Sequence, residues 1–143
     1  MKKPTILIII IIVLAIIGFS LLFWCSSCKN NLTQVETGDI TNLNIAANQA
    51  ISSPLTITGK AKGPWFFEAS FPIVLVDWDG LIIAESIAQA EGDWMTEGLV
   101  PFTATLKFTK PAYGERGAII LKRDNPSGLP AGDAAVEIPV IFK

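Results

Sequence analysis

A long apolar stretch near the N-terminus sets the first limit on how this chain folds. It runs from Ile6 to Trp24 and is interrupted only by Gly18 and Ser20. As a helix, a segment of about 19 residues rises roughly 28 Å, which matches the hydrocarbon core of a bilayer. The apolar part of a cleaved signal peptide usually has only about 7–15 residues, and the ring of Trp24 suits the membrane interface. We therefore expect one uncleaved N-terminal transmembrane helix that contacts the lipid bilayer through Ile6 to Trp24. A cleaved signal peptide and a buried core helix are the alternatives.

The charges that flank this stretch predict its orientation. Lys2 and Lys3 precede it, and after it only Lys29 follows before a long gap. Because basic flanks tend to stay in the cytoplasm, the N-terminus is expected there and the rest of the chain outside. The predicted location is the cell membrane, crossed once, with an extracytoplasmic domain.

Cys25 and Cys28 close the predicted anchor, residues 1–28, in a C-x-x-C pattern. Boundary cysteines, free or paired with each other, are the favoured interpretation. A thioredoxin-like redox pair needs a strand-to-helix setting, whereas this pattern follows a membrane helix. Lipidation of Cys28 after cleavage agrees with the small Ser27, but Cys25 stands where a leucine-like residue is usual in a lipoprotein signal.

Residues 29–50 are rich in Asn and Thr and lack sustained periodicity. We interpret them as a polar stalk whose end, near Leu43–Ile45, adds at most an edge strand.

From residue 51 to residue 143 the pattern changes to short strands separated by turns. Apolar and polar residues alternate from Leu55 to Lys62, which is typical of a half-buried strand. Asp79-Gly80 lies between two apolar runs and is a strong hairpin signal. Further strands are predicted over 65–70, 73–76, 81–90, 102–108, 118–121 and 136–142. About seven strands without an amphipathic helix predict an all-β fold, an antiparallel β-sandwich over residues 51–143.

Composition excludes several classes of function. Lys+Arg total 11 against 13 Asp+Glu, and two of the lysines precede the apolar stretch, so the predicted domain is mildly acidic. A nucleic-acid surface needs clustered basic residues, so no nucleic-acid partner is expected. There is no histidine, which removes Ser-His and Cys-His catalysis and imidazole metal sites. No cofactor and no metal site are predicted.

Several segments of the predicted domain, in order along the chain, resemble the bacterial spore-germination immunoglobulin-like domain. They are Ile51-Ser52-Ser53-Pro54-Leu55-Thr56-Ile57-Thr58-Gly59-Lys60-Ala61, Trp65-Phe66-Phe67-Glu68-Ala69-Ser70-Phe71-Pro72, Gly92-Asp93-Trp94-Met95-Thr96-Glu97, Val100-Pro101-Phe102, Asp124-Asn125-Pro126-Ser127-Gly128-Leu129-Pro130 and Ile138-Pro139-Val140. The resemblance spans about Ile51 to Phe142. It implies an immunoglobulin-like sandwich of an extracytoplasmic bacterial protein, and it brings no catalytic residues with it.

The carboxylates near the predicted turns offer two chemical alternatives. A glycosidase would need two of them to face each other, one with a raised pKa. Calcium binding could start at Asp77-x-Asp79-Gly80, although the further oxygen ligands of a full loop are missing. Aspartate is also common in turns for local hydrogen bonding, which is the favoured interpretation.

The aromatic residues and one loop supply the candidate binding surface. Most of Trp65, Phe66, Phe67, Trp78 and Trp94 are expected in the core, but Trp65 and Trp94 follow turn residues and are expected to reach the surface. The candidate surface residues are Trp65, Trp94, Asp93, Asp124, Asn125, Pro126 and Ser127. The favoured function is a non-enzymatic binding or assembly module of the bacterial cell envelope. Its partner would be an unidentified envelope protein or peptidoglycan, and a sporulation or germination role stays open. An envelope hydrolase that uses carboxylates, and an inhibitor or chaperone-like sandwich acting through its end loops, are the alternatives.

Overall fold

The computed structural model describes residues 37–143. Their regular elements are β1 (Ile40–Thr41), β2 (Gln49–Ile51), β3 (Leu55–Lys62), the 3-10 helix η2 (Gly63–Trp65), β4 (Ser70–Asp77), β5 (Ile82–Ala90), β6 (Leu99–Leu106), β7 (Arg116–Lys122), the 3-10 helix η3 (Pro130–Gly132) and β8 (Ala135–Phe142). The prediction of an all-β domain is confirmed. Within this part of the chain, no helix is long and apolar enough to cross a membrane. The predicted helix from Ile6 to Trp24, together with Cys25 and Cys28, lies outside the described residues.

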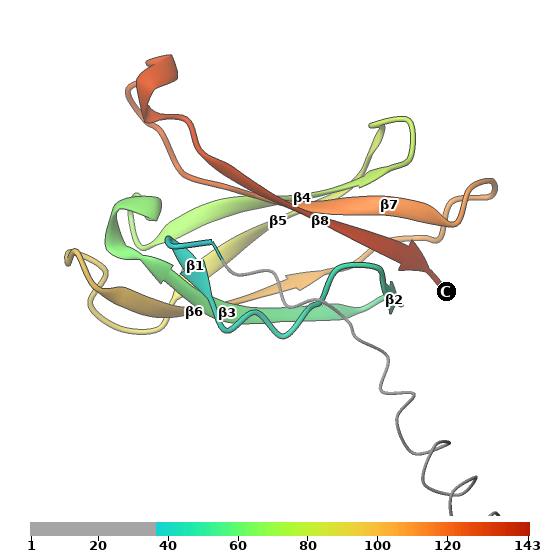
Figure 1. The fold of residues 1–143 in the computed structure, drawn as a ribbon, viewed down its shortest axis with the longest axis horizontal. Helices are drawn as coiled ribbons and strands as arrows, with labels where there is room; N and C mark the ends of the chain where they lie inside the picture. The colour runs from blue at the N-terminus through green and yellow to red at the C-terminus, as the bar shows by residue number, and fades with distance from the viewer. Residues whose placement is uncertain (1–36) are drawn as a thin grey trace, which may run out of the picture. The chain divides into compact units, whose positions relative to one another are not determined.

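The strands are hydrogen-bonded in the order β1-β3-β6-β5-β4-β7-β8-β2 and fold into two layers (Figure 1). β3 pairs with β6 in one layer, and β4, β7 and β8 pair in the other. β5 joins the layers, because it pairs with β4 along most of its length and with β6 only at Gln89 and Ala90. All pairs are antiparallel except that of β2 with β8.

The core lies between the two layers and is filled by alternate residues of each strand. In β4, Phe71, Ile73 and Leu75 are fully buried, while the residues between them face outward. The ring of Phe71 meets that of Phe102 from β6 edge to face, with 4.9 Å between the centroids. Such a pair stabilises a fold by about 0.5–1.5 kcal/mol beyond its burial. Residues 37–143 contain no cysteine, so packing rather than disulfides holds the layers together.

The domain begins earlier than the sequence indicated, and the prediction of a stalk up to residue 50 is wrong. Ile40, Leu43 and Ile45 are buried in the core. Asn44 acts as an edge strand through its side chain: Nδ2 donates to the Thr56 carbonyl at 3.0 Å, and Oδ1 accepts from the Thr58 N–H at 2.9 Å. Asn44 therefore satisfies the part of the β3 edge that β1 does not pair, which explains why the segment lacks a strand pattern.

The connections also differ in part from the prediction. Residues 65–70 do not form a strand: η2 is followed by a turn in which Glu68 and Ala69 both have positive φ, 49° and 61°. Pro72 lies within β4, opposite Ile87 of β5 and outside the pairing with β7. The hairpin at Asp79-Gly80 is confirmed as the link from β4 to β5. Of its turn residues only Gly80 has positive φ, so the turn is not of the primed type that is common in short hairpins.

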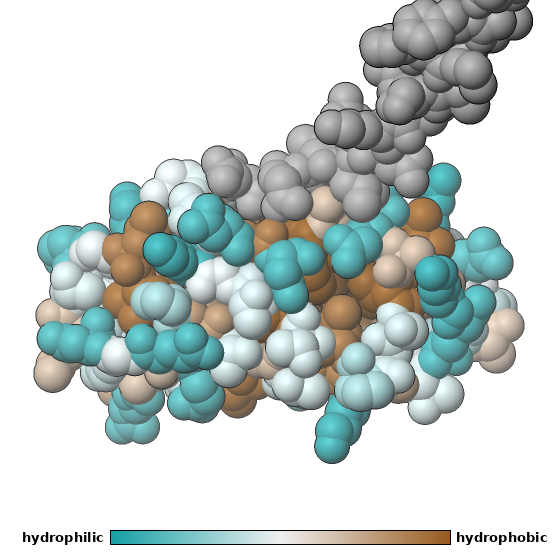
Figure 2. Space-filling model, turned by 90° about the horizontal axis from the view of Figure 1, so that it is seen from below, coloured by the Kyte–Doolittle hydropathy of each residue, from teal (hydrophilic) through white to brown (hydrophobic). Residues whose placement is uncertain are grey.

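The surface carries hydrophobic side chains in separate places. On the side shown in Figure 2, hydrophobic areas are divided by hydrophilic residues. The large hydrophobic side chains with the greatest exposure are at loops: Met95, Tyr113, Trp78, Leu129 and Leu81. The most exposed hydrophobic side chains therefore lie at the two ends of the sandwich, which makes these ends the candidates for binding.

Candidate functional site

The antiparallel pairing brings three connections to one end of the sandwich, which we name the η2 end: residues 63–69, 91–98 and 123–134. These connections lie on the left of Figure 1. Every candidate surface residue predicted from the sequence belongs to this end: Trp65, Asp93, Trp94, Asp124, Asn125, Pro126 and Ser127. The structure therefore gathers residues that are up to about sixty positions apart in the sequence.

Trp65 does not reach the surface, and that prediction is wrong. Its side chain is 3% exposed and packs edge to face on Phe71 with centroids 5.9 Å apart. Pro64 lies at the start of η2, and the tight turn of this helix directs the indole inward. The Trp65 carbonyl accepts the N–H of Asp124 at 3.1 Å, so Trp65 joins two loops and supports the η2 end from within.

Asp39 lies beside Trp65 and links the start of the domain to β3. Its Oδ1 is 2.8 Å from Lys62 Nζ, and its Oδ2 accepts a hydrogen bond from Trp65 Nε1 at 3.5 Å. The hydrogen bonds from Lys62 and Trp65 lower the pKa of Asp39, with a smaller contribution from the charge of Arg123. A carboxyl group held ionised in this way acts as a structural partner and not as a general acid.

The loop that contains Asn125 is organised by its own hydrogen bonds. Asn125 Nδ2 donates to the Leu129 carbonyl and to Asp133 Oδ1, both at 2.8 Å, while Oδ1 accepts from Ser127 Oγ at 2.6 Å. A Cβ on Gly132 would lie 2.8 Å from Asn125 Oδ1. The Asn125 amide is thus used inside the loop, whereas Pro126 and Ser127 are exposed.

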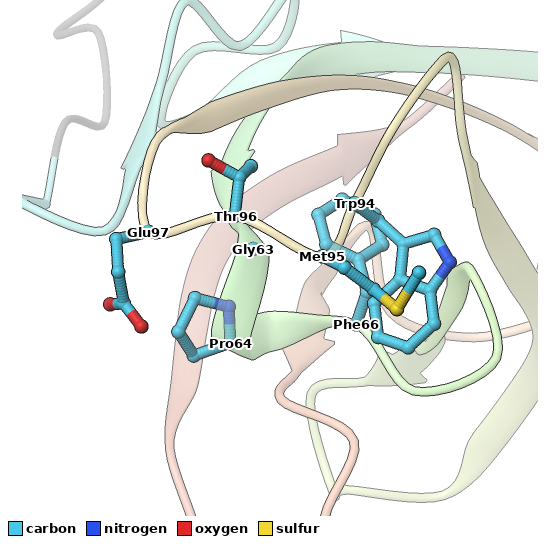
Figure 3. Close-up of a pocket in the computed structure, with 7 residues that line it drawn as sticks. All are labelled: Gly63, Pro64, Phe66, Trp94, Met95, Thr96 and Glu97. Carbon is cyan, nitrogen blue, oxygen red and sulfur yellow. The ribbon is translucent and has the colours of Figure 1, made fainter.

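Trp94 borders a shallow hollow of about 310 Å³ at the η2 end. Figure 3 shows Trp94, Met95 and Phe66 gathered on one side of it, with Pro64 and Glu97 on the other. Trp94 is half-buried and packs against the core, and Met95 is 77% exposed. The Met95 N–H donates to Asp93 Oδ1 at 3.0 Å, which fixes the loop. This hollow presents an apolar surface with an acidic margin.

The opposite end, which we name the Trp78 end, holds the connections 52–54, 78–81 and 107–115. Trp78 is 64% exposed and Tyr113 is 73% exposed. The turn under Trp78 is locked by Asp77, whose Oδ1 accepts the N–H groups of Asp79 at 3.0 Å and of Leu81 at 2.9 Å. Asp77 is the buried charged residue of the described part of the chain.

The sequence reasoning placed Trp78 among core aromatics and gave it no role at the surface. The alternation in β4 indicates the exposure of Trp78. Phe71, Ile73 and Leu75 are buried, so the even-numbered positions, which include Trp78 if the alternation continues, point outward. A tryptophan on the outward side of a turn is a strong candidate for recognition because it offers a large, rigid surface.

The carboxylates of the domain do not assemble into a metal site within residues 37–143: no group of three or more His, Cys, Asp or Glu residues there could hold an ion. The calcium alternative uses Asp77 as its first ligand, but Asp77 Oδ1 already accepts hydrogen bonds from two backbone N–H groups. The Asp77 carboxylate therefore stabilises the turn.

Two mainly antiparallel layers, closed by β2 running parallel to β8, define a small domain of the immunoglobulin-like class. Residues 46–128 match the Gmad2 family, the immunoglobulin-like domain of bacterial spore germination. The match covers more than half of the chain, and the chain belongs to this family. The matched span begins before Ile51 and ends before β8, so it differs at both ends from the resemblance that the sequence suggested. Among curated proteins and among solved structures, no match was found.

Proposed function

We propose that the chain is a membrane-anchored module that displays its immunoglobulin-like domain outside the bacterial cytoplasm and binds another component of the cell envelope. The partner is an envelope protein or a cell-wall glycan, and the family description makes a germination setting relevant. The apolar stretch from Ile6 to Trp24 supports the anchor.

The observation that carries the binding role is the presentation of Trp78. The Trp78 side chain is 64% exposed, and the hydrogen bonds of Asp77 hold its turn in one shape. Binding to a fixed side chain loses less conformational entropy than binding to a mobile one. An exposed aromatic on a rigid turn is therefore suited to recognition.

The ionisable groups support binding over catalysis. A catalytic carboxylic acid needs a raised pKa at neutral pH. The pKa of the Asp39 carboxyl group is lowered, which is opposite to this requirement, and the sequence contains no histidine as a general base. We propose that the module has no catalytic role of its own.

The test is retention of envelope material on the immobilised full chain in detergent. Wild type is compared with Trp78→Ala and Trp94→Ala, and the retained fraction is analysed for protein and for sugar. Retention that depends on either tryptophan supports a binding module. No retention, combined with consumption of a glycan or peptide substrate by the wild type, would contradict it.

A further inference from the structure

A groove adjoins the Trp78 end, and the residues that line it favour one class of ligand. We propose that this groove binds a glycan strand, a chain of pyranose rings from the cell wall. The choice of a cell-wall source rests on the proposed envelope function; the binding chemistry comes from the groove itself.

The groove consists of two adjoining hollows of about 580 and 480 Å³ that share Trp78 and Arg116. The first reaches Tyr113 and Glu115, and the second runs over the outer side of β4 and β7 to Glu137 of β8. The two hollows adjoin at these two side chains, so a ligand that is longer than one hollow can contact both. A chain of repeated units suits this arrangement more than a single small molecule.

The groove is lined by aromatic rings and by charged side chains of both signs. A pyranose ring has an apolar face of C–H groups and a rim of hydroxyl groups, so it matches a planar ring next to polar side chains. Trp78 and Tyr113 supply the rings. Arg116, Glu115 and Glu137 supply donors and acceptors, and the ion pair found in residues 37–143 joins Asp39 and Lys62, so it leaves these three groups available.

The backbone around the groove argues against an extended peptide as the ligand. Strand addition requires a free sheet edge with unpaired N–H and C=O groups. β4 is paired on one side with β5 and on the other with β7, and β7 is paired with β4 and β8. A peptide therefore cannot add a strand to β4 or β7 in this groove, whereas a glycan does not need a free sheet edge.

The Trp78 indole is also held in position before a ligand arrives. Trp78 lies against Gly114, where an added Cβ would be 2.5 Å from its Cδ1. The Asp77 carboxylate fixes the turn on the other side. Loops from two different parts of the chain thus orient one indole, and this preorganisation increases affinity because less entropy is lost on binding.

The experiment uses the full chain in detergent with two probes: peptidoglycan purified free of protein and anionic polymers, measured by co-sedimentation, and the hexamer of N-acetylglucosamine, measured by calorimetry. We expect Trp78→Ala to weaken binding about tenfold or more, as for an interface hot spot, and Arg116→Ala to weaken it less. Phe67→Ala removes an exposed ring from the η2 end and is expected to leave binding unchanged. Thermal unfolding of each variant verifies that the domain remains folded.

Two outcomes overturn the glycan assignment. One is absence of binding of both probes to the folded wild type, and the other is equal binding by Trp78→Ala. If the immobilised chain still retains an envelope protein in either case, the binding function stands and only the ligand class fails. If neither glycan nor protein is retained, the proposed function fails as well.

Discussion

The indole of Trp78 packs against Gly114, so that a methyl group at residue 114 would be 2.5 Å from Trp78 Cδ1. This relationship connects the turn after β4 with the loop before β7. It makes the exposed tryptophan part of a defined surface, and it can be altered without touching the tryptophan itself.

Replacement of Gly114 by alanine is expected to displace the Trp78 ring. Gly114 also has φ of +85°, where an alanine is destabilised by about 1–2 kcal/mol. We expect altered acrylamide quenching of Trp78 fluorescence, measured as the difference from the same variant in a Trp78→Phe background. Gly128→Ala is the matched control, since Gly128 has φ of +65° with no atom within 4 Å of an added Cβ. Identical Trp78 quenching in the two glycine variants would contradict the contact.

Asp77→Ala is expected to loosen the turn that carries Trp78. The change leaves the N–H groups of Asp79 and Leu81 without their acceptor, and the net contribution of one such hydrogen bond to stability is about 0.5–1.5 kcal/mol. Urea unfolding measures the change, and hydrogen exchange at Leu81 localises it. Asp77→Asn retains the Oδ1 acceptor and should lose less stability. Asp79→Ala removes an exposed carboxylate and serves as the control; if it matched Asp77→Ala, the assigned hydrogen bonds would not be what holds the turn.

Leu43→Ala tests whether the domain includes the segment that resembles a stalk. Leu43 is 3% exposed and lies against Gly59, where an added Cβ would be 2.9 Å from Leu43 Cδ2. Truncation of a buried leucine destabilises a domain by about 2–5 kcal/mol. A change in the free energy of unfolding below about 0.5 kcal/mol, the size seen for surface substitutions, would indicate that this segment belongs to a stalk and not to the folded domain.

The Asp39–Lys62 pair makes the stability of the domain depend on pH at acidic values. Because the pKa of Asp39 is lowered in the folded state, its contribution is present above the unfolded value of about 3.9 and is lost as the pH falls through the folded value. The pair is about half exposed, 44% and 49%, so the effect is small. We expect the stability difference between wild type and Asp39→Asn to shrink as the pH falls from 6 to 3. A difference that stays constant would contradict the lowered pKa.

The strands that could be predicted are those with one buried and one exposed face. β3 and β8 alternate along their whole length, and their bounds agree with the sequence pattern within one residue. The segment around Asn44 could not be recognised, because its edge pairing uses a side-chain amide that leaves no period in the sequence. The turn at Glu68-Ala69 has positive φ at both residues without the Gly or Asn that usually signals it.

Part of the candidate site could be predicted from the turn residues in the sequence. The turn residues at 93 and 124–127 indicated loops, and the topology places those loops at one end. The direction of a tryptophan at a strand boundary is harder to infer: Trp65 follows Gly-Pro and is buried, whereas Trp78 precedes Asp-Gly and is exposed. Position relative to turn residues alone does not distinguish the two, since packing of η2 decides the first and the alternation of β4 decides the second.

Both the binding role and the glycan assignment require the domain to face the outside of the cell. Tyr113 is exposed, and residues 37–143 have no cysteine, so Tyr113→Cys in a Cys25→Ser, Cys28→Ser background places a single thiol at the Trp78 end. Intact cells are treated with a maleimide that does not cross membranes. We predict labelling without lysis, equal to that after lysis; labelling that occurs only after lysis would contradict the account.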